Sequence, residues 1–344
     1  AAQIALVKQD GSIVPGSDRS LTFDGKPTVQ IPAGAPMLSD AVDLKIPAFA
    51  NVAISIYIPG QVTPSTFHLL GQRPTSISST GNFTGSESIP DAKQTTSWYW
   101  LSGLEFWAPN ETTAIVTLGD SITDGFGVKP GEYEDWPDQL ADRLARNKDL
   151  SAIAVDNEGI GGNRILYDGA GVSALARFDR DVLAKPGVTE VILLEGINDI
   201  GWPNMKPFPM KDGSIRKNPF TGEAVTANDL ILGMKQIIER AHAHGIKIFG
   251  ATMTPYKGAS YFTPGGEVVR EAVNDWIRSG GAFDGVIDFD AAVRDPKDPE
   301  KYRDDYQTGD YLHPNAAGYQ AMASAINIGE LRALSAKSPE RVAK

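Results

Sequence analysis

From Thr113 onward, short apolar runs alternate with segments whose apolar residues recur at helical spacing, and this alternation restricts the possible folds more than any other feature. The apolar runs predict five strands: Ala114–Leu118, Ile153–Asp156, Val191–Leu194, Ile246–Ala251 and Val286–Phe289. The helical patterns predict helices over about Trp136–Arg146, Val172–Leu183, Ala227–Ala243, Glu267–Ser279 and Asn315–Leu334. Strands that alternate with helices form a parallel sheet with helices on both faces. We therefore expect an α/β domain over residues 111–336, followed by a short C-terminal tail, 337–344.

The chain before this domain has a different pattern. Alternating apolar and polar residues predict strands at Thr28–Ile31, Val52–Ile58 and Trp98–Phe106, and turn signals such as Asp24-Gly25 separate them. No segment here repeats at helical spacing. We expect residues 1–110 to form an all-β domain, a sandwich or jelly-roll-like module.

Four short motifs, called boxes below, follow strand-like runs or enter a helix: Thr117–Gly125, Asn157–Arg164, Glu195–Asp199 and Gly309–Asn315. Their key residues are Ser121, Gly162, Asn198 and His313, and His313 follows Asp310 by three positions. Alone, each has an ordinary explanation as a helix cap or a turn. Together they supply a nucleophile, a base with an orienting acid, and donors for a developing oxyanion. A glycine lets a backbone N–H approach closely, and an Asn side chain supplies an NH₂ group. This set is suited to acyl transfer through a covalent intermediate.

The base can be sought by elimination, because the chain has four histidines. His68 lies in the β-rich region. His242 and His244 lie near the end of a predicted helix, on different faces, which argues against a shared metal. His313 remains, and an Asp-x-x-His turn can place a carboxylate against one ring nitrogen. Two other nearby acids are alternatives to Asp310: Asp304 and Asp305.

The four boxes resemble those of the SGNH hydrolases, also called GDSL esterases and lipases, over about residues 112–330. Ile122 stands where the family name has Leu, and the two side chains are isosteric. The resemblance implies a flavodoxin-like three-layer fold with strand order 2-1-3-4-5. It also implies a triad of Ser121, Asp310 and His313. The implied oxyanion hole consists of the backbone N–H groups of Ser121 and Gly162 and the side chain of Asn198.

The substrate is less constrained. Four residues are candidates for contact with it, either because they follow the oxyanion glycine or because they are aromatic: Asn163, Arg164, Trp202 and Tyr256. We expect small acyl esters, with O-acetylated carbohydrate first. The alternatives are a short-chain lipid or aryl esterase, a lysophospholipase, an acyltransferase, or a carbohydrate-binding protein with a vestigial hydrolase domain.

Composition limits the partners. A net charge of −11 argues against a nucleic-acid-binding role, which needs a basic surface. The absence of cysteine excludes disulfides and thiolate chemistry. No apolar run approaches the ~20 residues of a membrane helix, and no metal or nucleotide motif is present, so we expect neither a membrane span nor a cofactor. The start at Ala1-Ala2 fits a processed signal peptide or a chain trimmed in another way, and the family resemblance favours a secreted or periplasmic protein. The oligomeric state stays open.

Overall fold

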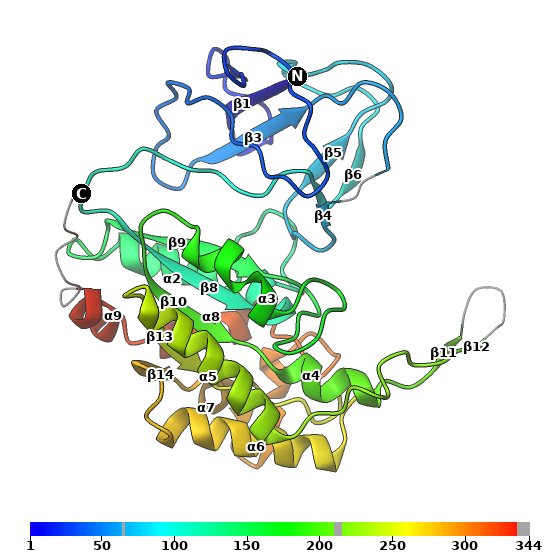
Figure 1. Ribbon diagram of the computed structural model, residues 1–344, viewed down its shortest axis with the longest axis vertical. Helices are drawn as coiled ribbons and strands as arrows, with labels where there is room; N and C mark the ends of the chain where they lie inside the picture. The colour runs from blue at the N-terminus through cyan, green and yellow to red at the C-terminus, as the bar shows by residue number, and fades with distance from the viewer. Residues whose placement is uncertain (64–65, 210–214, 336–344) are drawn as a thin grey trace. The chain divides into compact units, whose positions relative to one another are not determined.

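The computed structural model describes residues 1–63, 66–209 and 215–335 (Figure 1). Its internal contacts divide the chain into two compact units. The first unit comprises Ala1–Phe67 and Pro74–Leu101, and the second comprises His68–Arg73 and the chain from Ser102 onward. The predicted domain boundary at residue 110 stays a prediction, and the predicted tail, 337–344, lies outside the described residues.

The first unit is rich in antiparallel β-structure. Strand β1 (Ala2–Val7) pairs with β2 (Arg19–Leu21) on one side and with β3 (Asn51–Ile56) on the other. Strand β5 (Thr75–Ile77) pairs with β6 (Lys93–Thr95). The short strands β4 and β7 cover Phe67–His68 and Trp98–Tyr99. The N-terminal region is therefore β-rich, as the alternating pattern predicts.

Two of the predicted strands in this region are wrong in part or in full. Thr28–Ile31 is not a strand, and it lies between Pro27 and Pro32, which cannot donate to a strand ladder. The predicted strand Trp98–Phe106 ends at Tyr99. Trp100 has a φ of 58°, a left-handed conformation that interrupts an extended strand.

The second unit contains a five-stranded parallel sheet in the order β14-β13-β10-β8-β9. Its strands are β8 (Thr113–Gly119), β9 (Ile153–Gly159), β10 (Val188–Leu194), β13 (Lys247–Ala251) and β14 (Gly285–Ile287). Numbered along the chain, this order is 2-1-3-4-5, so the predicted flavodoxin-like topology is confirmed. In such a sheet, ligands bind at the carboxyl ends of the strands near the point where the order reverses, here between β8 and β10.

Helices cover both faces of this sheet (Figure 1). The longer ones are α2 (Trp136–Ala145), α5 (Ala227–Ala243), α6 (Pro264–Ser279), α8 (Ala316–Ala325) and α9 (Ile328–Ser335). The shorter ones are α1 (Ser121–Asp124), α3 (Ala174–Phe178), α4 (Ile197–Gly201) and α7 (Phe289–Val293), and a π-helical turn, Asp179–Leu183, continues α3. Short strand pairs lie in the loops: β11 (Phe208–Pro209) with β12 (Ile215–Arg216), and β15 (Arg294–Asp295) with β16 (Asp298–Tyr302).

Most predicted elements of this unit are confirmed, with two corrections at their ends. The predicted helix Asn315–Leu334 is two helices, because the Asn327 side chain accepts the backbone N–H of Gly329 and starts a new helix. The predicted last strand ends at Ile287, and Phe289 begins α7. The Asp288 side chain caps that helix by accepting the N–H of Ala291.

The alternation of side chains along each strand builds two apolar layers. Val116 and Leu118 of β8 face one layer with α3, α5 and α6, whereas Ile115 faces the other with α2, α7 and α8. Strand β10 follows the same rule, with Val191 and Leu193 on the first face. The strands are therefore apolar on both faces, as in a parallel sheet between helices.

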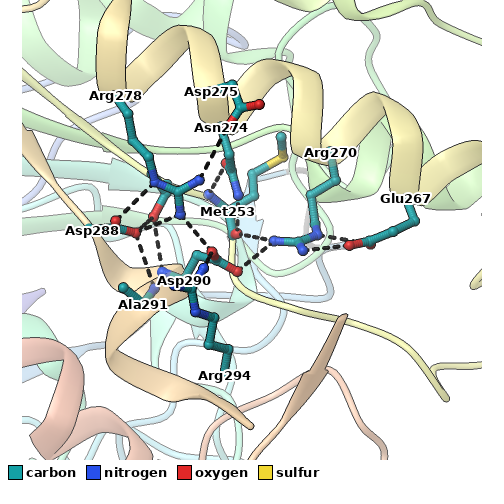
Figure 2. Close-up of polar contacts among 11 residues, drawn as sticks. Met253, Glu267, Arg270, Asn274, Asp275, Arg278, Asp288, Asp290, Ala291 and Arg294 are labelled. Carbon is teal, nitrogen blue, oxygen red and sulfur yellow. Dashed lines mark hydrogen bonds and ion pairs between the residues drawn. The ribbon is translucent and has the colours of Figure 1, made fainter. Parts of the chain in front are cut away.

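An ion-pair network joins α6 to the start of α7 (Figure 2). Arg270 pairs with Glu267 and Asp290, and Arg278 pairs with Asp288 and Asp290. Arg270 also donates a hydrogen bond to the backbone carbonyl of Met253, the second residue after β13. The Asn274 side chain holds both the N–H and the carbonyl of Met253, at 2.8 Å each. Two side chains of α6 therefore hold the start of the loop that follows β13.

Candidate active site

Ser121 is the first residue of α1 and directly follows the tight turn that leaves β8. Asp120 caps the helix by accepting the N–H of Ile122 at 2.9 Å. Gly119 makes the turn close, because an added Cβ would come within 2.7 Å of the Leu194 carbonyl oxygen. As the first residue of α1, Ser121 has a backbone N–H without an acceptor inside the helix. The turn thus presents a hydroxyl and an N–H at the carboxyl end of the sheet.

A chain of two hydrogen bonds links Ser121 to an acid. The Ser121 Oγ lies 2.8 Å from His313 Nε2, and His313 Nδ1 lies 2.6 Å from Asp310 Oδ2. The other Asp310 oxygen accepts the backbone N–H groups of Leu312 and His313 at 2.9 Å each. Burial raises the pKa of Asp310, but the hydrogen bonds from His313 outweigh burial and hold that pKa well below its ordinary value. Of the alternative acids, Asp305 pairs instead with Arg303.

The imidazole of His313 is held from one side by an aromatic ring. The Phe126 ring lies with its centroid 4.1 Å from that of His313. The backbone N–H of Phe126 donates to the Ser121 carbonyl at 2.9 Å, so the ring belongs to the same turn as the hydroxyl. The sequence gives no signal for this contact. Because of this contact, one short segment carries Ser121 and also packs against the ring of His313.

Gly162 and Asn198 follow the two strands that flank β8. Gly162 has a φ of 78°, and an added Cβ would lie 2.7 Å from the Trp202 ring and 2.9 Å from the Ala170 Cβ. Asn198 lies in α4, is buried, and its Nδ2 donates to the Asn163 carbonyl at 3.0 Å. The same Nδ2 lies 3.4 Å from the Asp120 carboxylate. The first three boxes therefore meet at one place.

Arg177 lies fully buried beneath these boxes. Its guanidinium donates to the Gly119 carbonyl at 3.0 Å, to the Glu158 carbonyl at 2.7 Å and to Asn163 Oδ1 at 2.9 Å. It also pairs with Asp181 at 3.0 Å. Sequence reasoning missed this residue, because in the sequence it is one arginine on a helix. It joins the backbone before Ser121 to the loop that carries Gly162.

Three buried carboxyl groups belong to the same boxes: Asp120, Glu195 and Asp199. Burial raises the pKa of Asp120 to about 7 and that of Asp199 to about 6, and it raises the pKa of Glu195 well above its ordinary value. Asp199 accepts the backbone N–H groups of Ile165 and Leu166 at 2.8 and 3.0 Å. Asp120 and Asp199 therefore hold backbone N–H groups close to the candidate oxyanion hole.

Asp124 connects the Ser121 turn to two other segments. Its Oδ2 accepts the backbone N–H of Gly161 at 3.0 Å and lies 3.0 Å from His68 Nε2. His68 belongs to the short segment His68–Arg73 that the contacts group with the second unit. The sequence gives no signal for this contact, which spans 56 positions.

The four candidate substrate contacts differ in exposure. Asn163, Arg164 and Tyr256 are buried, whereas Trp202 is half-buried. Arg164 pairs with Glu223 at 2.6 Å and lies 5.0 Å from the centroids of the Trp202 and Phe220 rings. Their contact with substrate stays a prediction. Beside His313, an open hollow of about 420 Å³ is lined by residues 258–260 and 309–313.

The remaining histidines contact other groups. His242 lies 2.7 Å from Asp284, and His244 lies 2.9 Å from the Arg240 carbonyl. Within residues 1–63, 66–209 and 215–335, no three His, Cys, Asp or Glu side chains gather closely enough to hold a metal ion. Among the described residues, no helix has the length and hydropathy needed to cross a bilayer.

Comparisons with known proteins match this region of the chain. Residues 117–321 match the model of the GDSL-like lipase/acylhydrolase family. None of the curated proteins matches the chain. Among solved structures, a G-D-S-L family protein from Desulfitobacterium hafniense DCB-2 is 22% identical, with a TM-score of 0.44 over 64% of this chain and 99% of that chain. A GDSL-like lipase from Bacteroides thetaiotaomicron VPI-5482 is 18% identical, with a TM-score of 0.43 over 64% and 89%. The aryl esterase of M. smegmatis is 16% identical, with a TM-score of 0.47 over 65% and 100%.

Proposed function

Because the chain belongs to the GDSL-like lipase/acylhydrolase family and is an ester hydrolase, we propose that it cleaves small acyl esters, acetyl esters of carbohydrates first, through an acyl-enzyme on Ser121. The single observation that carries the mechanism is the continuous chain of hydrogen bonds from Ser121 through His313 to Asp310. All three groups are present and in contact, which argues against a vestigial domain.

In the first step, His313 Nε2 takes the proton of Ser121 as the hydroxyl oxygen attacks the ester carbonyl. Asp310 accepts the Nδ1–H bond, which keeps the ring in the tautomer that leaves Nε2 free to act as a base. The low pKa of Asp310 keeps this carboxyl ionised, so it also stabilises the imidazolium that forms.

The tetrahedral oxyanion is stabilised by three donors: the backbone N–H groups of Ser121 and Gly162 and the side-chain NH₂ of Asn198. Loss of one such donor costs about 2.7–4 kcal/mol of transition-state stabilisation. The alcohol then leaves with the proton held by His313. Water, activated by the same ring, releases the acid and restores Ser121.

The packing around Gly162 supports a short acyl group. The Trp202 ring and Ala170 fill the space behind this glycine, so a long acyl chain has little room on that side of the oxyanion. The hollow beside His313 supports a larger alcohol, because His313 must face the leaving group in order to protonate it. A small acid esterified to a bulky alcohol such as a sugar fits both features.

The test is a substrate panel with Ser121→Ala and His313→Ala as controls. Nitrophenyl acetate, butyrate, octanoate and laurate are compared with acetylated xylo-oligosaccharides and a lysophospholipid, each with and without an added alcohol. We expect acetyl esters to give the highest kcat/KM and both variants to lose activity. Preference for laurate or lysophospholipid would instead support a lipid esterase, and transfer to the alcohol in preference to water would support an acyltransferase. Retained hydrolysis in Ser121→Ala would overturn the mechanism.

A further inference from the structure

The orientation of the Asn198 amide decides whether this side chain stabilises or destabilises the oxyanion. Its NH₂ group is a donor and its carbonyl oxygen is an acceptor, and a rotation of the amide by half a turn exchanges them. The rotated form would direct a carbonyl oxygen at the developing oxyanion. The bond from Nδ2 to the Asn163 carbonyl at 3.0 Å favours the productive form. The carbonyl end of the amide needs a donor of its own.

Tyr261 supplies that donor. Its hydroxyl lies 3.3 Å from Asn198 Oδ1, and both side chains are buried. An amide oxygen only accepts, so the phenol must donate the proton. Burial raises the pKa of Tyr261 well above its ordinary value, which keeps the hydroxyl protonated.

The fold brings Tyr261 to Asn198 from a distant segment. The loop after β13 starts at Met253, whose backbone is held by Arg270 and Asn274 (Figure 2). The Tyr261 ring then packs on α4 at Gly201, where an added Cβ would lie 2.5 Å from the ring. Gly201 and Asn198 are one turn apart on that helix. The absence of a side chain at Gly201 therefore lets the ring lie against the helix that carries the amide.

We propose that Tyr261 is a positioning residue that holds the Asn198 amide with its NH₂ group facing the oxyanion. This inference rests on the proposed function, because it assigns Tyr261 a role only if Asn198 stabilises an oxyanion. Tyr256, the candidate substrate contact, lies in the same loop, and its contact with substrate stays a prediction.

Tyr256 is the matched control. Its ring lies 6.0 Å from that of Tyr261 and is also buried, but its hydroxyl faces Gly266 of α6 and not Asn198. Tyr→Phe at either position removes one oxygen and keeps the ring. Only the change at Tyr261 removes a donor from Asn198.

The experiment is a double-mutant cycle with nitrophenyl acetate as substrate and an alkyl boronic acid as a mimic of the tetrahedral intermediate. We expect Tyr261→Phe to lower kcat about tenfold and to leave KM within about twofold, and this loss should depend on the presence of Asn198. Any effect of Tyr256→Phe should instead be the same with Asn198 and with Ala at position 198. Asn198→Ala should lower kcat by about a hundredfold or more, and adding Tyr261→Phe to it should change nothing further. In Tyr261→Phe, the affinity for the boronic acid should fall by a factor similar to that for kcat. Both quantities depend on how well the enzyme binds the tetrahedral intermediate.

Two results would overturn the inference. One is a Tyr261→Phe enzyme as active as wild type. The other is the same tenfold loss in the Asn198→Ala background, which would mean that Tyr261 acts independently of the amide. Ser121→Ala in the same assay separates the two proposals: its full activity would overturn the hydrolytic mechanism, whereas an inactive Ser121→Ala beside a fully active Tyr261→Phe would overturn the role of Tyr261 alone.

Discussion

The Asp124 carboxylate accepts the backbone N–H of Gly161 at 3.0 Å, so one side chain joins the turn of the proposed nucleophile to the loop of the proposed oxyanion glycine. The two segments also pack without a gap, because an added Cβ at Gly159 would come within 2.6 Å of the Asp124 Cα. The position of Gly162 relative to Ser121 therefore depends on a contact that neither residue makes itself.

Removal of the Asp124 carboxylate is expected to reduce catalysis in a protein that still folds. Asp124→Ala leaves the half-buried Gly161 N–H without its acceptor, which costs about 1 kcal/mol of stability, and it releases the loop that carries Gly162. We expect kcat with a short nitrophenyl ester to fall about tenfold or more. Asp124→Asn, which keeps an oxygen for Gly161, should recover most of that loss. Equal losses in the two variants would contradict this account.

We expect His68 to make a pH-dependent contribution to stability. Burial lowers the pKa of His68, but the hydrogen bond and charge of Asp124 outweigh burial and raise it above the ordinary value. A histidine whose folded pKa is raised stabilises the fold fully below the unfolded pKa of about 6.5, and this contribution is lost as the pH rises through the folded pKa. As the pH rises, the free energy of unfolding should therefore fall less in His68→Gln than in wild type.

Urea unfolding at about pH 6 and about pH 8.5 measures this difference. Wild type should lose more stability between the two conditions than His68→Gln does. His244→Gln is the control, because its ring contacts the Arg240 carbonyl and not a carboxylate, and it should keep the wild-type pH dependence. If His68→Gln also kept that dependence, the pH effect would belong to other groups.

Arg177 should be among the costliest single positions in the second unit. Arg177→Met leaves the buried Glu195 without its cation and removes one of the two arginines that pair with Asp181, and breaking a buried ion pair from one side costs about 3–5 kcal/mol. Arg180 also pairs with Asp181, but 64% of its side chain is exposed. Arg180→Met should therefore cost at most about 1 kcal/mol. A comparison of the two urea midpoints checks this, and similar losses at both positions would count against the buried network.

The sequence predicts residues that are marked by a pattern in neighbouring positions. It does not predict residues that act only through contacts with distant segments. The strands and the position of Asn198 follow from apolar runs and from short boxes that each occupy a few neighbouring positions, whereas the strand order is implied by the family resemblance. Arg177, His68 and Tyr261 act through contacts with segments far away in the sequence, and each has ordinary neighbours. Tyr256 and Tyr261 lie in one loop, and no local pattern tells which ring turns toward Asn198.

Backbone geometry accounts for the other differences. The helix after His313 divides because Asn327 caps a new helix, although its neighbours would also suit a helix interior. The strand that starts at Trp98 stops because Trp100 adopts a left-handed conformation, which is rare for an aromatic residue. The Asn327 cap is a local bond that Asn favours, whereas the Trp100 N–H is bound by the distant Thr66 carbonyl at 3.1 Å, a contact that propensity does not predict.

A comparison of Gly162→Ala with Gly245→Ala separates two effects of the added methyl group: strain in the backbone and contact with neighbouring side chains. Gly162 and Gly245 both have left-handed backbones, with φ of 78° and 70°, so Ala at either position costs about 1–2 kcal/mol. At Gly245 nothing lies within 4 Å of an added Cβ, whereas at Gly162 the Trp202 ring would lie at 2.7 Å. We expect similar small losses of stability from the backbone term. We expect only Gly162→Ala to lower kcat/KM, by about a hundredfold or more, because the methyl group displaces the N–H from the oxyanion. Steady-state kinetics and thermal unfolding of the two variants make the comparison, and a fully active Gly162→Ala would remove Gly162 from the oxyanion hole.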